Sequence, residues 1–438
     1  MRLILQILII FILSFEMTLS APLSKASSKP SSPLTLKQAQ DIALKQHPEI
    51  LASKYRLSAS EYVVKEVDAN YLPQINLNGV RAFSNNNARI ASESQGIANS
   101  LILDRLSYGV SASQLITDFG RTGYLSSSAK DQVKAQAYQS LSIRERVVFE
   151  VTSCYYNVLR AQKILEVALK TQKARQLLFD KIYALQESQL KSSLDVSMAS
   201  QLLYEAKQLV LNAENNLDKA WADLSKALGF KETKHFILKD TQEVSPLKHE
   251  FDHFLKQAQK YNPEINKIRA ELSAAQNKYS ADQASNYPSI NAFGYAGETP
   301  LRDKSKLDSS YGAAGINLSF PVFTGGRITA IATRSKEQMN AVIQDLVEKD
   351  NKLSRDIRVA WDNAQTAYEN IKVSQEIFKT STESLILMQE RYAAKLNSIV
   401  DLSQVELSQT QAEIAYSNAI YDYVIHLAFL AYLVGSKL

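Results

Sequence analysis

Two stretches of the chain, residues 124–228 and 327–434, contain neither glycine nor proline and are each longer than a hundred residues. All 13 Gly and all 10 Pro of the 438 residues lie outside them. In a helix interior these two residues cost about 1 and 3 kcal/mol relative to alanine, so their exclusion indicates helix. The two stretches are therefore predicted to be almost wholly helical.

Apolar residues recur in both stretches at alternating steps of four and three, which is the seam of a coiled coil. The seam positions are Val147, Val151, Cys154, Val158, Ala161, Leu165 and Ala168 in the first stretch, and Leu353, Ile357, Ala360, Ala364, Ala367 and Ile371 in the second. A straight helix of such length would run about 160 Å. Each stretch is therefore predicted to fold back as a hairpin, with turns near 189–193 and 395–398.

The second half of the chain repeats the first. At an offset of 215 residues Pro48-Glu49-Ile50 aligns with Pro263-Glu264-Ile265, and at an offset of 206 residues Gly120-Arg121 aligns with Gly326-Arg327. The second register continues without a gap to the end of each hairpin. A unit of about 200 residues is too long for a solenoid repeat, so the duplication predicts two structurally equivalent halves.

Each half is predicted to hold a helical segment, a strand, a polar loop, a second strand and the helical hairpin. The expected helical segments are 36–70 and 251–285, the strands are 74–83, 106–116, 289–296 and 311–322, and the loops are 84–104 and 297–310. The predicted boundaries are a signal peptide at 1–20, a flexible lead at 21–34, the first repeat at 35–229, a linker at 230–250, the second repeat at 251–435 and a tail at 436–438.

The N-terminus has the pattern of an export signal. Met1-Arg2 is positively charged, Leu3–Phe15 is apolar apart from Gln6 and Ser14, and small residues precede the expected cleavage site after Ser20. The apolar run is too short to cross a bilayer, which argues against the alternative of an N-terminal anchor. The apolar segment 423–434 is also too short, so the mature chain is expected to lie outside the inner membrane without a helical span.

The strands alternate between apolar and polar residues. In 311–322, Ile316, Leu318, Phe320 and Val322 oppose Gly315, Asn317 and Ser319. Strands of about ten residues with one apolar face suit an outer-membrane β-barrel, although a soluble four-stranded sheet packed on one face has the same pattern. Four strands cannot close a barrel, and an open sheet edge is not tolerated in lipid. The barrel is therefore expected to be shared among identical chains, with twelve strands from three copies or eight from two.

Composition excludes several other classes of protein. Lys and Arg number 50 against 45 Asp and Glu, a formal net charge of +5 that predicts no nucleic-acid partner. The single cysteine, Cys154, excludes an internal disulfide and a Cys-rich zinc module. The glycines at 120–123 and 325–326 lack the lysine of a P-loop. No cofactor is expected.

One motif suggests an enzyme. His249-Glu250-Phe251-Asp252-His253 matches the H-E-x-x-H signature of zinc proteases, with Glu271 as a conceivable third ligand. Its counterpart at the 215-residue offset, Leu34-Thr35-Leu36-Lys37-Gln38, contains no ligand. We interpret the motif as a chance match or as acidic residues at a helix N-terminus, and we expect no metal site and no catalysis.

Three motifs resemble those of the outer-membrane efflux protein family, the TolC-like channels. They are Pro321-Val322-Phe323-Thr324-Gly325-Gly326-Arg327, its weaker copy Leu115-Ile116-Thr117-Asp118-Phe119-Gly120-Arg121, and Arg391-Tyr392 followed by Ser398 and Asp401. Together with the duplication, the resemblance covers nearly the whole mature chain. It implies a mainly α protein with membrane β: a homotrimer with a twelve-stranded barrel among outer-membrane lipid, and a periplasmic tunnel of coiled-coil hairpins. Residues 230–250 would then belong to an equatorial region.

The same resemblance implies a passive, porin-like exit duct in the outer membrane of a diderm bacterium, with a gate at the hairpin ends. Asp195 would bond to Tyr392, and Asp401 would join a ring of carboxylates on the three-fold axis. The alternative role for either aspartate is a helix N-cap just after the turn. The residues implied at the adaptor-docking tips are Gln189, Ser192, Lys395, Asn397 and Ser398.

The implied partners are a periplasmic adaptor and an inner-membrane transporter, of an RND or ABC type, in a tripartite efflux pump or a type I secretion system. Two rival functions remain at this point. One is a soluble periplasmic coiled-coil adaptor, for which a lipoyl-like β domain is missing from the sequence. The other is the zinc protease built on His249, Glu250 and His253.

Overall fold

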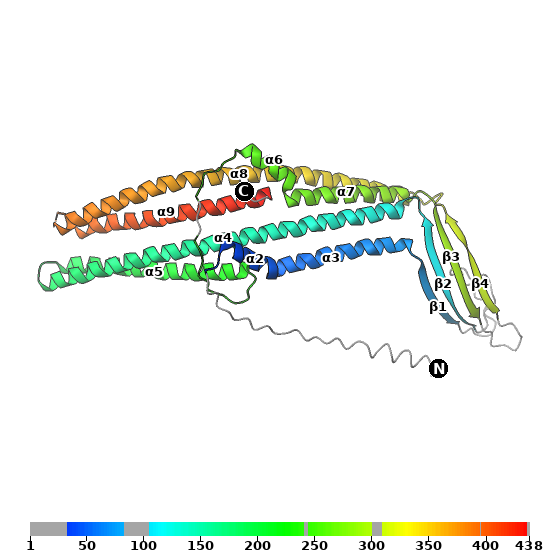
Figure 1. Ribbon diagram of the computed structural model, residues 1–438, viewed down its shortest axis with the longest axis horizontal. Helices are drawn as coiled ribbons and strands as arrows, with labels where there is room; N and C mark the ends of the chain where they lie inside the picture. The colour runs from blue at the N-terminus through cyan, green and yellow to red at the C-terminus, as the bar shows by residue number, and fades with distance from the viewer. Residues whose placement is uncertain (1–32, 83–104, 241–243, 300–308, 395, 436–438) are drawn as a thin grey trace, which may run out of the picture.

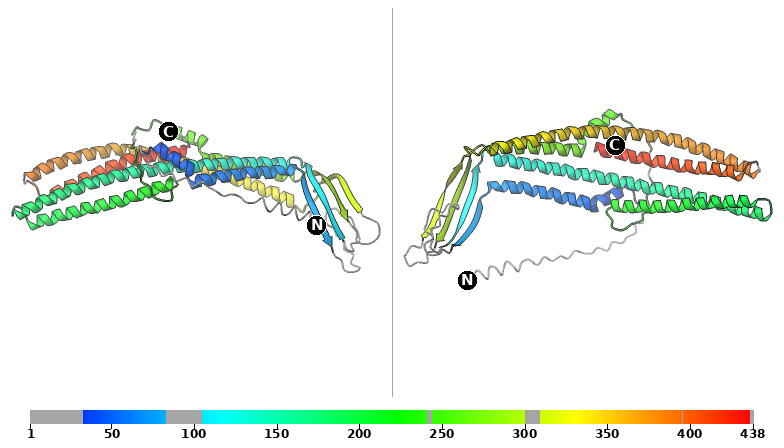
Figure 2. Two further views of the ribbon diagram at one scale, coloured as in Figure 1. Left: turned by 60° about the horizontal axis from the view of Figure 1, so that its bottom comes forward. Right: turned by 180° about the vertical axis from the view of Figure 1, so that it is seen from behind.

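The computed structural model describes residues 33–82, 105–240, 244–299, 309–394 and 396–435. The predicted signal peptide, nearly all of the predicted lead and the tail lie outside the described residues. Helical rods run along the length of the molecule, and a four-stranded sheet stands at one end (Figure 1). Figure 2 shows from two further sides that the rods form an open layer, against which the sheet is tilted.

The two Gly- and Pro-free stretches form the predicted hairpins. In the first half α4 (Arg121–Glu187) returns as α5 (Ser193–Ala227), and in the second half α8 (Arg327–Ala393) returns as α9 (Ile399–Val434). Both outgoing helices have 67 residues, which corresponds to about 100 Å of helix. The turns lie where the apolar pattern breaks, as predicted.

The single helical segment expected at the start of each half is two helices. α2 (Leu36–Gln46) is followed by α3 (Pro48–Asp68) and a short 3₁₀ turn (Ala69–Tyr71), and α6 (Phe251–Tyr261) is followed by α7 (Pro263–Ala284). Proline has no N–H and its ring excludes the preceding helical carbonyl, so it starts a helix rather than continuing one.

The residue before each proline caps the new helix. His47 Nδ1 accepts from the Glu49 N–H at 3.3 Å, and Asn262 Oδ1 accepts from the Glu264 N–H at 2.8 Å. The helical segment is therefore interrupted at the equivalent position in both halves.

In each half the returning helix and the post-proline helix stack end to end into a second rod (Figure 1). At one junction the Gln46 side-chain amide donates to the Leu228 carbonyl at 2.9 Å, and at the other the Asn262 amide donates to the Leu433 carbonyl at 2.8 Å. These bonds satisfy carbonyls that a helix end otherwise leaves without a partner. The same end-to-end stack is thus present in both halves.

The strands form one antiparallel sheet in the order β1-β2-β3-β4. Their bounds are Gln74–Ala82 for β1, Arg105–Thr117 for β2, Ser289–Thr299 for β3 and Ser309–Ser319 for β4. β3 runs further than predicted because Gly297 still pairs with both Gly109 and Tyr311. β4 ends earlier than predicted, just before Pro321, which cannot donate to a ladder.

Register gives the sheet one aliphatic face and an opposite face on which polar side chains lie beside Phe293, Tyr295 and Tyr311. Leu77 pairs with Val110, and Ile316 lies on the same face, while Asn78 and Ser111 lie on the opposite face. Leu77 is 83% exposed and Ile316 is 69% exposed. Among the described residues, β1 and β4 each have one edge that no other strand covers. The sheet therefore presents an unpartnered apolar face and two open edges.

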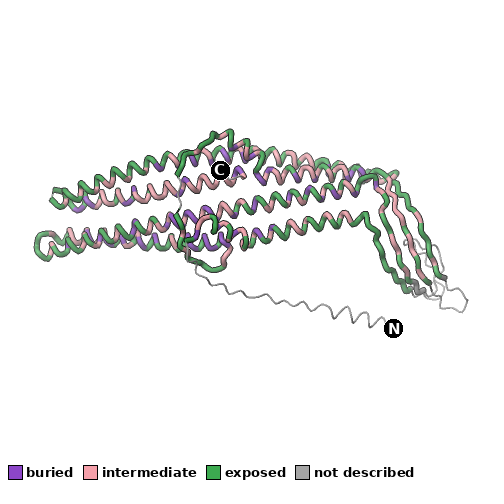
Figure 3. The backbone as a smooth tube through the Cα atoms, in the orientation of Figure 1, coloured by how far each residue is buried: buried purple, intermediate pink, exposed green. Residues whose placement is uncertain are grey.

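The core is a stripe along the helices rather than a central mass (Figure 3). At mid-length, the linker after the first repeat packs against the helical rods, and Leu34 forms a β-bridge with Leu238. The Tyr155 hydroxyl lies within hydrogen-bond distance of the carbonyl oxygens of Leu34 and Lys239, at 2.8 and 2.7 Å. Leu34, the last residue of the predicted lead, is therefore buried in this region.

Helix α9 as a whole is long and apolar enough to cross a membrane, judged by length and composition within the described residues. The shorter segment 423–434 was expected to be too short. In the structure α9 lies alongside α8 (Figure 1), and Tyr423, Leu430 and Val434 are buried against its neighbours.

Candidate functional site

The hairpins turn at the end of the molecule farthest from the sheet (Figure 1). Gln189 adopts a left-handed backbone with φ of 59°, a conformation that costs a side-chain-bearing residue roughly 1–2 kcal/mol. The Leu190 N–H donates to the Leu185 carbonyl at 2.8 Å, and at the 206-residue offset the Leu396 N–H donates to the Arg391 carbonyl at 2.9 Å. The two turns therefore close in the same way. Lys395 lies outside the described residues.

Both predicted aspartates cap the returning helices. The Ser192 N–H and hydroxyl donate to Asp195 Oδ2 at 3.0 and 2.8 Å, and the Asp195 N–H donates back to the Ser192 hydroxyl at 3.1 Å. Ser398 and Asp401 repeat this arrangement at 3.0, 2.8 and 3.2 Å. Each pair is a complete capping box. The capping alternative thus holds for both aspartates.

These bonds favour the charged form of the two carboxyl groups. The backbone N–H of Ser192, followed by its hydroxyl, lowers the pKa of Asp195, and Lys191 adds to the effect. Donors from Ser398 and Asn397 likewise lower the pKa of Asp401. Both side chains therefore carry a negative charge at the hairpin ends throughout the physiological range.

Asn397 connects the second turn to a cation. The Arg391 Nε–H donates to Asn397 Oδ1 at 2.7 Å, and the Asn397 amide reaches Asp401 Oδ2 at 3.5 Å. The side-chain amide of Asn397 therefore bridges the Arg391 guanidinium and the Asp401 carboxylate. The sequence motif contained this arginine, but only the turn brings it to Asn397.

A groove of about 930 Å³ separates the two hairpins near their ends. Asp195, Tyr392, Gln189, Ser192 and Asn397 all contribute to its lining. The predicted gate residues Asp195 and Tyr392 are thus brought to one groove.

Lys191 lies between these two residues. Its ammonium nitrogen is 3.8 Å from Asp195 Oδ1 and 5.3 Å from the centre of the Tyr392 ring. Within the described residues the hydrogen bonds of the Asp195 carboxylate are to Ser192, and the structure records none to Tyr392. Sequence reasoning missed Lys191, and its position next to Ser192 was the available signal.

A buried ion pair at the groove, to whose lining Glu406 contributes, was also missed. Arg175 on α4 lies 3.0 Å from Glu406 on α9, measured between Nη1 and Oε2, and their side chains are only 7% and 15% exposed. Arg175 falls on the continuation of the four-three seam that runs through Ala161 and Ala168. A charged residue at an apolar seam position was the signal that could have found it.

The residues of the zinc-protease motif do not form that site. α6 begins at Phe251, so His249 precedes the helix and cannot share a helical face with His253. The two imidazole rings stack with centroids 4.1 Å apart. Within the described ranges, no three His, Cys, Asp or Glu side chains are grouped to hold a metal ion. The residues present do not fit a catalytic zinc.

Cys154 is a packing residue. It lies against the core of the first half, and burial raises the pKa of its thiol to about 12. A thiol that stays protonated is a poor nucleophile.

The family model described as "outer membrane efflux protein" matches residues 40–230 and 254–436. Outer membrane protein TolC of Vibrio cholerae is 23% identical over 404 residues, covering 89% of this chain and 88% of that protein. The alkaline protease secretion protein AprF of Pseudomonas aeruginosa is 22% identical over 176 residues, 40% of this chain and 37% of that protein.

Among solved structures, the open state of the MtrE outer membrane channel of Neisseria gonorrhoeae superimposes with a TM-score of 0.74 at 20% sequence identity, covering 92% of this chain and 89% of that chain. At this identity the likeness shows the fold. It confirms the predicted TolC-like arrangement of duplicated hairpins and strands.

The family match spans both halves and leaves the short linker between them unmatched. The chain belongs to the outer membrane efflux protein family and is an outer-membrane exit duct with a long helical periplasmic part.

Proposed function

We propose that three copies of the chain close one twelve-stranded barrel in the outer membrane and continue it as a helical tunnel through the periplasm. The observation that carries this proposal is the sheet: its apolar face is exposed, and β1 and β4 are open edges within the described chain. Unpaired strand edges are not viable in lipid, so each edge needs a neighbour's strand. Twelve strands enclose a channel wider than eight strands do.

The proposal uses the domain boundaries that the sequence predicts. Residues 1–20 direct export, 21–34 lead into the fold, and the repeats at 35–229 and 251–435 each supply two strands and one hairpin. Residues 230–250 form the equatorial region, and 436–438 are a tail. The hydrogen bonds between the Tyr155 hydroxyl and the carbonyls of Leu34 and Lys239 support the assignment of this segment to an equatorial region.

The gate is assigned to the hairpin ends. Asp195, Lys191 and Tyr392 link the two hairpins of one chain across the groove, and three copies of Asp401 surround one axis. Carboxylates crowded at a constriction favour the passage of cations. The gate performs no chemistry, because neither a cofactor nor a catalytic group is needed for passive transport.

A periplasmic adaptor is expected to dock on the tips formed by Gln189, Ser192, Lys395, Asn397 and Ser398. Energy then comes from an inner-membrane transporter of the RND or ABC type. Two uses are compatible with the names of the relatives, which include a protease secretion protein and an outer membrane efflux protein. The tripartite efflux pump and the type I secretion system remain the two settings proposed.

The gate is tested in planar bilayers with Asp195→Ala combined with Tyr392→Phe. Loss of the carboxylate and of the hydroxyl is expected to loosen the closed end, so the double variant conducts more than the parent. Ser192→Ala is the matched control, because it breaks the capping box but leaves the carboxylate that faces Lys191. Equal conductance of parent and double variant would show that these side chains do not hold the gate.

A further inference from the structure

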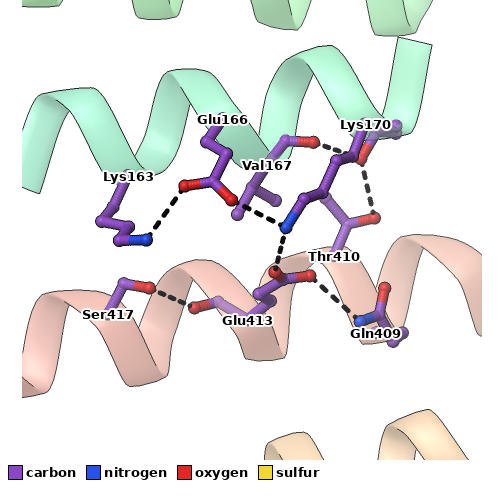
Figure 4. Close-up of polar contacts among 9 residues, drawn as sticks. Lys163, Glu166, Val167, Lys170, Gln409, Thr410, Glu413 and Ser417 are labelled. Atoms are coloured by element: carbon purple, nitrogen blue, oxygen red, sulfur yellow. Dashed lines mark hydrogen bonds and ion pairs between the residues drawn. The ribbon is translucent and has the colours of Figure 1, made fainter. Parts of the chain in front are cut away.

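The two hairpins of one chain meet along α4 and α9, where a run of polar pairs lies between aromatic contacts at mid-length, such as Phe149 with Phe429, and an apolar cluster near the tips that holds Ile182 and Ile399. From mid-length toward the tips it contains Arg160 with Asp422 at 2.7 Å, Lys170 with Glu413 at 4.0 Å, the hydroxyls of Thr171 and Thr410 at 3.5 Å, and Arg175 with Glu406 at 3.0 Å. Figure 4 shows Lys170 reaching from α4 to Glu413, with Glu166 and Lys163 beside it. We call this set of contacts the α4–α9 seam.

The interior of each hairpin is apolar by contrast. Ala168 packs on Val210 and Ala213 between α4 and α5, and Ala367 and Ile371 pack on Tyr423 between α8 and α9. Separating the partners of a hairpin would expose this apolar surface to water, and separating α4 from α9 would expose the polar pairs together with the apolar cluster around Ile182 and Ile399. The charged pairs are therefore what distinguishes the contact between the hairpins from the interior of each hairpin.

One pair in the seam differs from the others in burial. The side chains of Arg160 and Asp422 are 32% and 47% exposed, but those of Arg175 and Glu406 are 7% and 15% exposed. The facing Nη1 and Oε2 atoms lack the alignment of a hydrogen bond, and Nη2 donates to the Ser403 carbonyl at 3.4 Å. Burial raises the pKa of Glu406, and Arg175 opposes that effect. Each charge thus depends on the other while the hairpins stay together.

The internal duplication shows that this pair is present in one of two equivalent places. At the 206-residue offset, Arg175 aligns with Ser381 on α8, and Glu406 aligns with Ser200 on α5. In the proposed trimer, α8 of one chain would face α5 of the next as α4 faces α9. There the counterparts of Thr171 and Thr410 are Ile377 and Tyr204, which are 55% and 64% exposed in the single chain. The contact between chains is expected to be apolar where the seam is polar.

We infer that Arg175 and Glu406 form the latch that holds the two hairpins of each chain together beside the gate. The inference rests on the proposed gate and names the residues that position it. About 18 Å of helix separates Arg175 from the end of α4 at Glu187. Opening at the tips then requires the buried pair to separate, while the apolar contacts between chains stay closed.

Glu406→Gln tests the latch, because it keeps the shape of the side chain and removes its charge. The Arg175 cation is left buried without a counter-charge, which strongly favours separation and hydration, so the open fraction in planar bilayers should rise by about tenfold or more. Arg175→Glu should have the same effect. The exchange Arg175→Glu with Glu406→Arg should restore the parent's open fraction.

Asp422→Asn is the matched control on the same seam. Its partner Arg160 stays hydrated, so the open fraction should change by less than about twofold. A large effect of Asp422→Asn, or a charge exchange that fails to restore closing, would contradict a latch made by the buried pair.

A cross-link keeps the test decisive if a charge variant does not assemble. Thr171→Cys and Thr410→Cys, in a Cys154→Ser background, replace hydroxyls that lie 3.5 Å apart. Oxidation should abolish the rise in conductance of the Asp195→Ala, Tyr392→Phe variant, and a reductant should recover it. Conductance unaffected by the cross-link would overturn the latch, whereas no rise in the gate variant itself would overturn the proposed gate.

Discussion

At the scale of single residues, the two aspartates after the turns each have a local role that the structure establishes and a channel role that is proposed. Ser192 with Asp195 and Ser398 with Asp401 are capping boxes, so these carboxylates already stabilise their own helices. Their identity and spacing after the turn were predictable from sequence. Lys191 and Arg175 stand out by their positions in the sequence, but their contacts were not predictable, because what a long cation touches depends on which helix faces it.

Asp401→Ala separates the two roles of that residue. Without the carboxylate, the ring on the three-fold axis loses its charge, and cation selectivity measured by reversal potential in bilayers should fall. Ser398→Ala removes the cap and keeps the charge, so selectivity should be unchanged. If both substitutions leave selectivity as in the parent, Asp401 is a cap alone.

The pH dependence of that selectivity follows from the lowered pKa of Asp401. A carboxyl whose pKa is lowered in the folded state keeps its charge as pH falls to about 3.9, the ordinary value, and loses it only below. Selectivity should therefore be constant between pH 8 and pH 5. Loss of selectivity already at pH 6 would mean that crowding in the ring outweighs the donors from Ser398 and Asn397.

At the scale of elements, prolines and glycines decide where helices and strands stop. Pro48 and Pro263 split each expected helical segment at the same place, and Gln46 and Asn262 beside them donate to carbonyls at the ends of α5 and α9. The breaks are visible in the sequence, but the end-to-end stack needs α5 and α9 to arrive at them. Strand bounds were less predictable, since pairing with the next strand continues past the local pattern.

Gly297 tests how tightly the sheet is built. A Cβ atom there would lie 2.5 Å from the Tyr108 carbonyl oxygen and 2.6 Å from the Tyr311 hydroxyl. Gly297→Val should therefore lower the amount of folded protein in outer-membrane fractions several-fold. Gly79→Val on the edge strand β1, where nothing lies within 4 Å of the added atom, is the control. Equal yields of the two variants would show that β2 and β3 can move apart.

At the scale of the whole molecule, the proposed assembly makes the chain one sector of a larger wall. Large apolar side chains stay exposed in the described chain, both on the sheet, such as Leu77 and Ile316, and on the helices, such as Tyr204 and Ile377. Lipid can cover the first group because it lies on a membrane sheet. The second group lies on the periplasmic helices and needs other copies of the chain.

The mass of the detergent-extracted protein measures this directly. Each chain is 48.9 kDa before the signal peptide is removed, and the extracted particle should contain three of them. Tyr204→Lys combined with Ile377→Lys should dissociate the trimer, because it places cations in the apolar contact between chains. A single chain that is stable in water without detergent would contradict the shared barrel.

The sequence by itself determined the helices, their reversal points, the duplication and the alternation of the strands, because these follow from residue-by-residue preferences and from spacing along one chain. Only the tertiary structure decided which helices face each other, and so that Arg175 meets Glu406 while Lys191 lies between Asp195 and Tyr392. The physical reason is that ion pairs and burial depend on distances through space. Those distances are set when the two hairpins pack, and no local pattern in either hairpin contains them.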